Sequence, residues 1–377
     1  MNPTNYVEPK VKPGSACDLK IDKVNRTVTK SVSIQNEGIN NGYTKLIAEA
    51  QHMVNSNNKG EYFYPKVYFL SEIDGNLVCI MEYLFSGINF ADLLKNKVVS
   101  QDYIEKSLSF ILRVLFKDFY YVQENIDPNP NYILHNYINR AKERLKLTLK
   151  FCESKNYMIL FDIIKNGMVL NGIYYPSYFK YLEVITNDSI LLDKLSINYN
   201  TNSHHDLIPS NIMVECGDDC VSNFALIDPR GEAETGVFNR HFMYDMGKLF
   251  FGLSGFDLIR DMFDNDDRSI GYYNCQRYDD IYNIDFAFNT DNFIVKKYMS
   301  AYDSTLNFFK NSKFDYANCK RMFLFAETCN FVADIPCRLN NNDCEEIGIC
   351  FYLRAVETMS NFIEHEYGTK REEDIYE

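Results

Sequence analysis

The chain has 377 residues, of which 46% are hydrophobic, and its formal net charge is −13 at pH 7. This length is enough for two or three ordinary domains, or for one enzyme with two lobes. Because an acidic chain repels phosphate backbones and anionic lipid surfaces, nucleic acid and membrane surfaces are not expected partners.

The composition also favours an intracellular protein without a membrane span. Residues 1–12 lack an apolar signal region, and no stretch reaches the roughly 20 apolar residues that a membrane helix needs. The richest candidate, Leu108–Val122, contains three charged side chains and therefore predicts a buried helix. Eleven irregularly spaced cysteines indicate reduced thiols rather than disulfides or a zinc site. We expect a cytoplasmic location.

The first 87 residues predict a small antiparallel sheet with one helix. Tyr6–Ile34 alternates short apolar runs with turn formers, and Tyr43–Val54 then changes to helical spacing. Two further strands, Lys66–Ile73 and Leu77–Glu82, flank an Asp-Gly pair, which is a strong hairpin signal. The expectation is a five-stranded sheet with one helix in this region.

From Phe90 onward the hydrophobic pattern is mainly helical. Long amphipathic stretches occupy residues 101–123, 132–154 and 177–195, and helical segments resume from Asp245. Two short strands, Ile212–Glu215 and Phe224–Asp228, interrupt this pattern. The predicted class is therefore α+β, with a small N-terminal lobe of residues 1–87 and a large, mainly helical lobe of residues 88–377.

Residues 203–249 carry the groups that phosphoryl transfer requires. Asp206 and Asn211 lie five residues apart, Asp228 follows Asn211 by seventeen residues, and Asp245 follows seventeen later. This chemistry needs one carboxylate to orient the attacking hydroxyl, and further oxygen ligands to hold Mg²⁺ against the nucleotide phosphates. A hairpin between the two short strands would bring Asn211 and Asp228 to one edge.

These motifs resemble the catalytic core of the aminoglycoside phosphotransferase and choline kinase superfamily, which has a protein-kinase-like fold. The matching residues are His204-His205-Asp206-Leu207-Ile208-Pro209-Ser210-Asn211, Ile227-Asp228 and Tyr244-Asp245-Met246-Gly247. The superfamily's common form is His-Gly-Asp-Leu-x-Pro-x-Asn. The run Ile227-Asp228-Pro229-Arg230-Gly231 is similar to a branch of phosphotransferases associated with bacterial surface polysaccharides.

The resemblance implies a role for each matched residue. Asp206 would be the catalytic base, and Asn211 and Asp228 would bind Mg²⁺. Asp245 and His204 would support the catalytic loop. His205 departs from the pattern, because a glycine is usual there. It could contact the acceptor together with Arg230, or it could be a loop side chain in solvent.

The nucleotide side predicts a buried ion pair and a hinge. Lys30 lies within a strand, and Glu49 borders the apolar stripe of the following helix, where a carboxylate needs a cationic partner. Lys20, Lys23 and Lys45 compete with Lys30 for this role. Backbone groups of Glu82, Tyr83 and Leu84 resemble the superfamily's adenine-binding hinge, and the turn at Gly14 and Ser15 is the candidate phosphate loop.

Together these features predict an ATP-dependent small-molecule kinase with Mg²⁺ as its metal cofactor. ATP could be replaced by another NTP. The acceptor would be a hydroxyl of a sugar, an amino alcohol or an aminoglycoside-like compound. A protein kinase fits less well, because Asp-Phe-Gly and Ala-Pro-Glu motifs are missing. The alternative outside enzymes is a pseudokinase or nucleotide-binding scaffold. The sequence does not indicate an oligomeric state.

Overall fold

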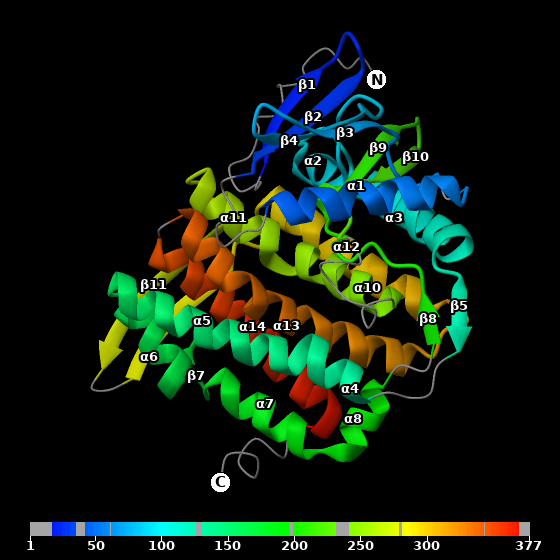
Figure 1. Cartoon of the computed structure of the whole chain (residues 1–377). Helices are drawn as coiled ribbons and strands as arrows, with labels where there is room; N and C mark the ends of the chain where they lie inside the picture. The colour runs from blue at the N-terminus through cyan, green and yellow to red at the C-terminus, as the bar shows by residue number, and fades with distance from the viewer. Residues whose placement is uncertain are drawn as a thin grey trace. The chain divides into compact units, whose positions relative to one another are not determined.

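The computed structural model describes residues 17–34, 42–60, 62–125, 130–196, 199–230, 241–278, 281–342 and 344–368. The chain divides into two compact units (Figure 1). Unit 1 comprises residues 1–121 and 202–240, and unit 2 comprises residues 122–201 and 241–377. This grouping differs from the expected lobe boundary at residue 87, because residues 88–121 and the 202–240 segment group with the N-terminal sheet.

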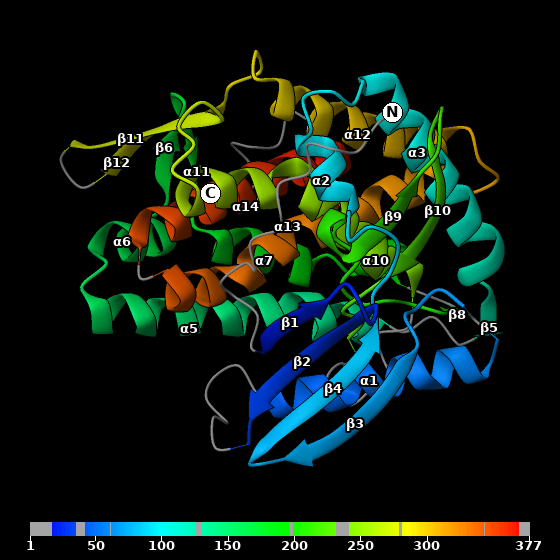
Figure 2. The same ribbon diagram turned by 90° about the horizontal axis from the view of Figure 1, so that it is seen from above.

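Unit 1 is built around a four-stranded antiparallel sheet with the order β1-β2-β4-β3. Its strands are β1 (Asp18–Asp22), β2 (Thr27–Ser33), β3 (Val67–Ile73) and β4 (Asn76–Glu82). The described residues thus contain four of the five expected strands, and residues 1–16 lie outside them. Helix α1 (Gly42–Asn58) runs along this sheet (Figure 2).

The local sequence explains the helix and the hairpin of this sheet. Leu46, Ala50 and Met53 are buried at helical spacing and form the inner stripe of α1. Asp74 and Gly75 both adopt positive φ angles, 48° and 75°. Two successive left-handed residues produce the turn that matches the twist of an antiparallel hairpin. The predicted hairpin between β3 and β4 is therefore confirmed.

The rest of unit 1 consists of helices and a second hairpin. Helix α2 (Phe90–Lys95) begins with a capping box, in which Asn89 and Asp92 exchange side-chain-to-backbone hydrogen bonds. Helix α3 (Gln101–Val114) continues into a π-helical turn at Leu115–Phe119. A 3₁₀ turn at Pro209–Asn211 leads into the antiparallel pair β9 (Ile212–Cys216) and β10 (Val221–Leu226).

Unit 2 is mainly helical. Its helices are α4 (Pro130–Ile133), α5 (Arg140–Lys155), α6 (Met158–Asn166), α7 (Tyr178–Asn187), α8 (Ser189–Leu195), α10 (Phe242–Phe251), α11 (Asp257–Asp264), α12 (Phe293–Lys310), α13 (Tyr316–Asn342) and α14 (Glu345–Tyr367). Two π-helical segments, Leu134–Asn139 and Gly252–Phe256, join helices. Helix α13 packs against α5, α10 and α14. A Cβ at Gly247 on α10 would collide with that of Ala326 on α13, so glycine permits this close packing.

Unit 2 also contains strands that the expectation of a mainly helical pattern from Phe90 onward missed. The long hairpin of β11 (Gly271–Tyr278) and β12 (Ile281–Phe288) belongs to a four-stranded sheet with β6 (Met168–Leu170) and β7 (Ile173–Tyr175). Strands β5 (Val122–Asn125) and β8 (Tyr199–Thr201) form a separate pair. Buried side chains alternate along β12 at Tyr282, Ile284 and Phe286, a period of two that distinguishes this segment from a helix.

These elements confirm the expected α+β class, with an antiparallel sheet in the N-terminal region and a mainly helical C-terminal part. All eleven cysteines lie among the described residues and carry free thiols. Within the described part of the chain, no helix combines the length and the apolar character needed to cross a membrane.

Candidate active site

Lys30 is the centre of a charged cluster in unit 1. It lies on β2 and is 9% exposed. Its Nζ is 2.5 Å from Glu49 Oε1 on α1, and it also pairs with Asp228 Oδ1, just beyond the end of β10. Among the competing lysines, Lys20 is exposed on β1. The structure therefore brings three of the proposed site residues together from three separate segments.

Electrostatics within this cluster keep Lys30 positively charged. Burial alone would lower the pKa of the Lys30 ammonium, but the carboxylates of Asp228 and Glu49 outweigh it and raise that pKa. Partial burial alone would raise the pKa of Asp228, but the neighbouring Lys30 ammonium outweighs this and lowers it. For Glu49 burial prevails, and its pKa rises to about 7. Asp228 is therefore the more firmly ionised of the two carboxyl groups.

The His204 side chain ties the segment of residues 204–211 to the Asp228 segment. The His204 Nε2–H donates to Ile227 O at 2.8 Å, and Nδ1 accepts from the Asp206 N–H at 3.2 Å. Both bonds require the neutral ring protonated at Nε2, since a carbonyl oxygen can only accept. Burial accordingly lowers the pKa of His204 to about 4. One neutral imidazole thus fixes the spacing between the two loops.

Asn211 and Asp228 lie at the same edge of the β9–β10 hairpin. The register pairs Ile212 with Leu226, and the Ile227 N–H donates to Asn211 O at 3.0 Å. The Asn211 side chain donates from Nδ2 to Asp206 O at 2.8 Å, which turns its Oδ1 away from that carbonyl. The Asp228 side chain is 47% exposed. An amide oxygen and an accessible carboxylate are therefore available at this edge.

Asp206 is held by a guanidinium group. Arg230 Nη2 and Nε lie 3.2 Å and 3.3 Å from Asp206 Oδ2. The Asp206 side chain is 14% exposed, and that of Arg230 is 36% exposed. The Arg230 N–H also donates to His204 O at 3.0 Å, so backbone and side chain both join the two loops.

His205 has a left-handed backbone conformation, with φ at 66°. This conformation favours glycine, so a histidine at this position carries backbone strain. The alternative of a solvent-exposed side chain is wrong, since His205 is 3% exposed. Its Nδ1–H donates to Arg230 O at 3.1 Å. His205 therefore adds another link between the loops.

The expected hinge residues Glu82, Tyr83 and Leu84 lie at the end of β4 and directly after it. The N–H groups of Glu82 and Tyr83 donate to Lys66 O and Arg26 O, both at 2.9 Å. The Leu84 N–H donates to no group among the described residues. Of the three expected hinge residues, Leu84 thus offers the available backbone donor.

The remaining predicted residues are Gly14, Ser15 and Asp245. Gly14 and Ser15 lie outside the described residues. Asp245 is fully buried on α10 of unit 2. Sequence reasoning missed Tyr64, whose ring lies nearly parallel to that of His204, with centroids 6.0 Å apart and planes at 14°. Tyr64 follows Tyr62 and Phe63, and this aromatic run has no spacing that marks its contact with the loop.

Comparisons with known proteins do not assign this chain to a family. No family model matches the chain, and no curated protein matches it. Among solved structures, the chain is similar to the choline kinase from Cryptosporidium parvum Iowa II, with 12% sequence identity and a TM-score of 0.40. That match covers 96% of this chain and 94% of the other.

Proposed function

We propose that this protein is an ATP-dependent phosphotransferase that moves the γ-phosphate to a hydroxyl of a small molecule. The observation that carries this proposal is the Lys30 ammonium, which contacts both Glu49 and Asp228. A helix carboxylate, a strand lysine and a second carboxylate joined in this way are the parts that phosphoryl transfer needs around a nucleotide.

The oxygen donors fit Mg²⁺ as the metal. Asn211 Oδ1 and the exposed part of the Asp228 carboxylate are hard ligands, of the type that this cation prefers. When bound, Mg²⁺ would neutralise charge on the nucleotide phosphates. Lys30 would support the same phosphates from β2, and Glu49 would keep its ammonium in place. The Leu84 N–H and neighbouring carbonyl groups of the hinge would bind the adenine edge.

Asp206 would orient the acceptor hydroxyl and accept its proton late in the transfer. An ordinary carboxylate is a weak base, so positioning is its main contribution in a loose transition state. Arg230 holds Oδ2 of Asp206 and so fixes the orientation of this carboxylate toward the hydroxyl. His204 holds the loop that carries Asp206. These roles assign each group of the cluster a distinct step.

Acceptors in this proposal are sugars, amino alcohols or aminoglycoside-like compounds. Among these classes the guanidinium beside Asp206 favours the sugars, because it would repel the ammonium groups of amino alcohols and aminoglycoside-like compounds. The free thiols, together with the use of ATP, support a cytoplasmic location.

A screen of hydroxylated metabolites with γ-labelled ATP tests the proposal. The full chain is expected to transfer label to at least one acceptor only when Mg²⁺ is present. Asp228→Ala should remove this metal-dependent transfer while circular dichroism stays unchanged, and Asp18→Ala, at an exposed position on β1, should retain it. Equal transfer by Asp228→Ala and the wild type would contradict the metal assignment.

A further inference from the structure

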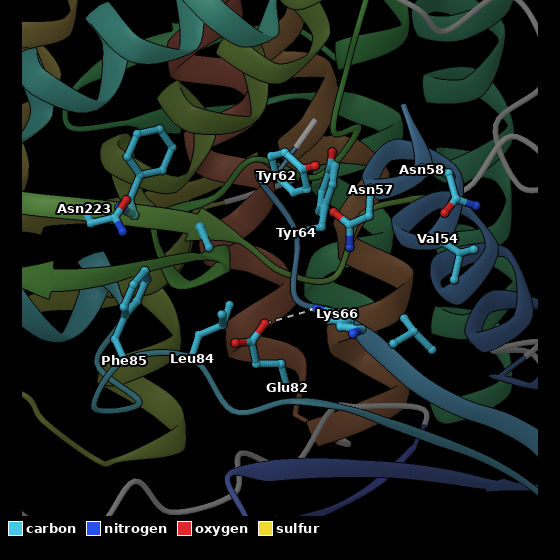
Figure 3. Close-up of a pocket in the computed structure, with 13 residues that line it drawn as sticks. Val54, Asn57, Asn58, Tyr62, Tyr64, Lys66, Glu82, Leu84, Phe85 and Asn223 are labelled. Atoms are coloured by element: carbon cyan, nitrogen blue, oxygen red, sulfur yellow. Dashed lines mark hydrogen bonds between the residues drawn. The ribbon is translucent and has the colours of Figure 1, made fainter. Parts of the chain in front are cut away.

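Unit 1 contains a pocket of about 580 Å³ that is separate from the charged cluster (Figure 3). Its walls come from the end of α1, the 62–67 segment, the hinge side of β4 and strand β10. Of the proposed nucleotide-binding residues, Glu82 and Leu84 of the hinge line this pocket, whereas Lys30, Glu49, Asp206, Asn211, Asp228 and Arg230 do not. Its volume falls within the range of about 300–1,000 Å³ that is typical of small-molecule sites.

The polar groups of the pocket favour a neutral ligand with an N–H donor. Lys66 and Glu82 contribute opposite charges, so the lining has no net charge. The Asn57 Nδ2 donates to Pro65 O at 3.2 Å, which fixes the orientation of this carboxamide. Its Oδ1 is buried and accepts no hydrogen bond from the described residues. Because an unsatisfied buried acceptor is costly, a ligand N–H that reaches Asn57 Oδ1 would be favoured.

The apolar groups favour a flat ring. Four aromatic side chains, those of Tyr62, Tyr64, Phe85 and Phe224, line the pocket (Figure 3). Aromatic side chains bind planar ligands by stacking and edge contacts. The lining therefore suits an aromatic carboxamide or an amino-heterocycle.

Tyr64 connects this pocket to the catalytic loop. It lines the pocket, stacks against His204 and places its hydroxyl 3.2 Å from His52 Nε2 on α1. His204 in turn bonds the backbone of Ile227 and Asp206. Since Tyr64 is buried against these neighbours, a ligand that displaces its ring must also change the surroundings of His204.

We propose that this pocket is a second ligand site, which takes a neutral aromatic carboxamide or amino-heterocycle and acts on the catalytic loop through Tyr64 and His204. Binding at this site does not depend on the reaction catalysed. Its effect on turnover rests on the proposed phosphotransferase function.

Nuclear magnetic resonance of histidine-labelled full-length protein tests the binding. The chain has six histidines, and variants in which one histidine at a time is replaced assign their ring signals. Nicotinamide is the probe, and methyl nicotinate, which has the same ring without an N–H donor, is its matched control. Nicotinamide should shift the His204 and His52 signals saturably in the millimolar range, and methyl nicotinate should bind about tenfold more weakly.

Two asparagine variants locate the site. Asn57→Leu should abolish the saturable shift, whereas Asn55→Leu, at an exposed position of the same helix outside the pocket, should retain it. Absence of a saturable His204 shift in the wild type, or an equal shift in Asn57→Leu, would overturn the site.

The regulatory effect has a separate readout. Nicotinamide should change wild-type turnover severalfold and leave Asn57→Leu turnover unaffected. Saturable binding with unchanged turnover would overturn the coupling and support the site alone. If no acceptor were phosphorylated at all, the proposed function would fail, and the resonance shifts would still decide whether the pocket binds.

Discussion

The guanidinium of Arg230 contacts one oxygen of Asp206 with both Nε and Nη2, at 3.3 Å and 3.2 Å. The proposed catalytic base is thus oriented by a residue only two positions after the proposed metal ligand Asp228. The backbone N–H of Arg230 also donates a hydrogen bond to the His204 carbonyl. Arg230 therefore links Asp206 and His204 to the segment that carries Asp228.

Replacing Arg230 should reduce turnover, because Asp206 would lose the group that orients its carboxylate. Arg230→Gln is expected to lower kcat by about tenfold or more, since an ion-paired hydrogen bond is worth about 1.5–3 kcal/mol. The kcat of Arg230→Lys should lie between those of the wild type and Arg230→Gln, because lysine keeps the positive charge but loses the planar guanidinium group. Steady-state kinetics check both. If Arg230 acts by positioning, Arg230→Gln should have little further effect in an Asp206→Asn background.

Removing Lys30 should affect stability as well as nucleotide binding. Lys30→Met leaves Glu49 and Asp228 without their common cation. Removing one partner of a buried ion pair costs about 3–5 kcal/mol of unfolding free energy. The half-exposed Asp228 makes the lower part of this range the expectation. Glu49→Gln should cost less, because Asp228 keeps its partner. Urea unfolding measures both, and equal stability of Lys30→Met and the wild type would contradict the ion-pair account.

Acid should destabilise the fold through His204. Its pKa is lowered from 6.5 to about 4 in the folded state, so the unfolded state binds more protons between these values. The stability present above pH 6.5 is therefore lost as the pH falls toward 4, by up to about 3 kcal/mol. The raised pKa of Glu49 acts in the opposite direction.

The comparison of wild type with His204→Asn separates these effects. Since Asn does not titrate, the variant should show a shallower loss of unfolding free energy between pH 6.5 and 4. Identical slopes for the two proteins would show that His204 is not held neutral in the folded state.

The left-handed backbone at His205 predicts an unusual tolerance of glycine. His205→Gly removes one hydrogen bond and a buried ring but relieves strain of about 1–2 kcal/mol. We expect its stability to stay within about 1 kcal/mol of the wild type. His205→Val, with a branched side chain at positive φ, should lose clearly more. Thermal unfolding checks this order, and a His205→Val variant more stable than His205→Gly would contradict the strain at this position.

Local patterns in the sequence predicted much of unit 1. The Asp74-Gly75 turn and the stripe of α1 follow from backbone preferences and hydrophobic period, so short segments suffice to predict them. The Lys30–Glu49 contact followed from the need of an inward carboxylate for a cation. These features depend on residues that are close in sequence or on one electrostatic requirement.

The remaining features depend on long-range packing. The β11–β12 hairpin was missed because it lies among helical segments, although Tyr282, Ile284 and Phe286 alternate with polar residues. The stacking of Tyr64 on His204 joins positions 140 residues apart, and no local pattern predicts such a contact. The sequence left two positions for the His205 side chain, in solvent or at the acceptor. Its hydrogen bond to the Arg230 carbonyl, 25 residues away, has no local signal in the sequence.

The kinetics of Asp206→Asn test the central claim most directly. In the proposed mechanism Asp206 orients the acceptor hydroxyl and does not hold the nucleotide, so ATP affinity measured by calorimetry should remain near that of the wild type. Turnover with the acceptor found by screening should fall by roughly a hundredfold or more, the scale of losing a general base. Wild-type turnover by Asp206→Asn with that acceptor would contradict the proposed mechanism.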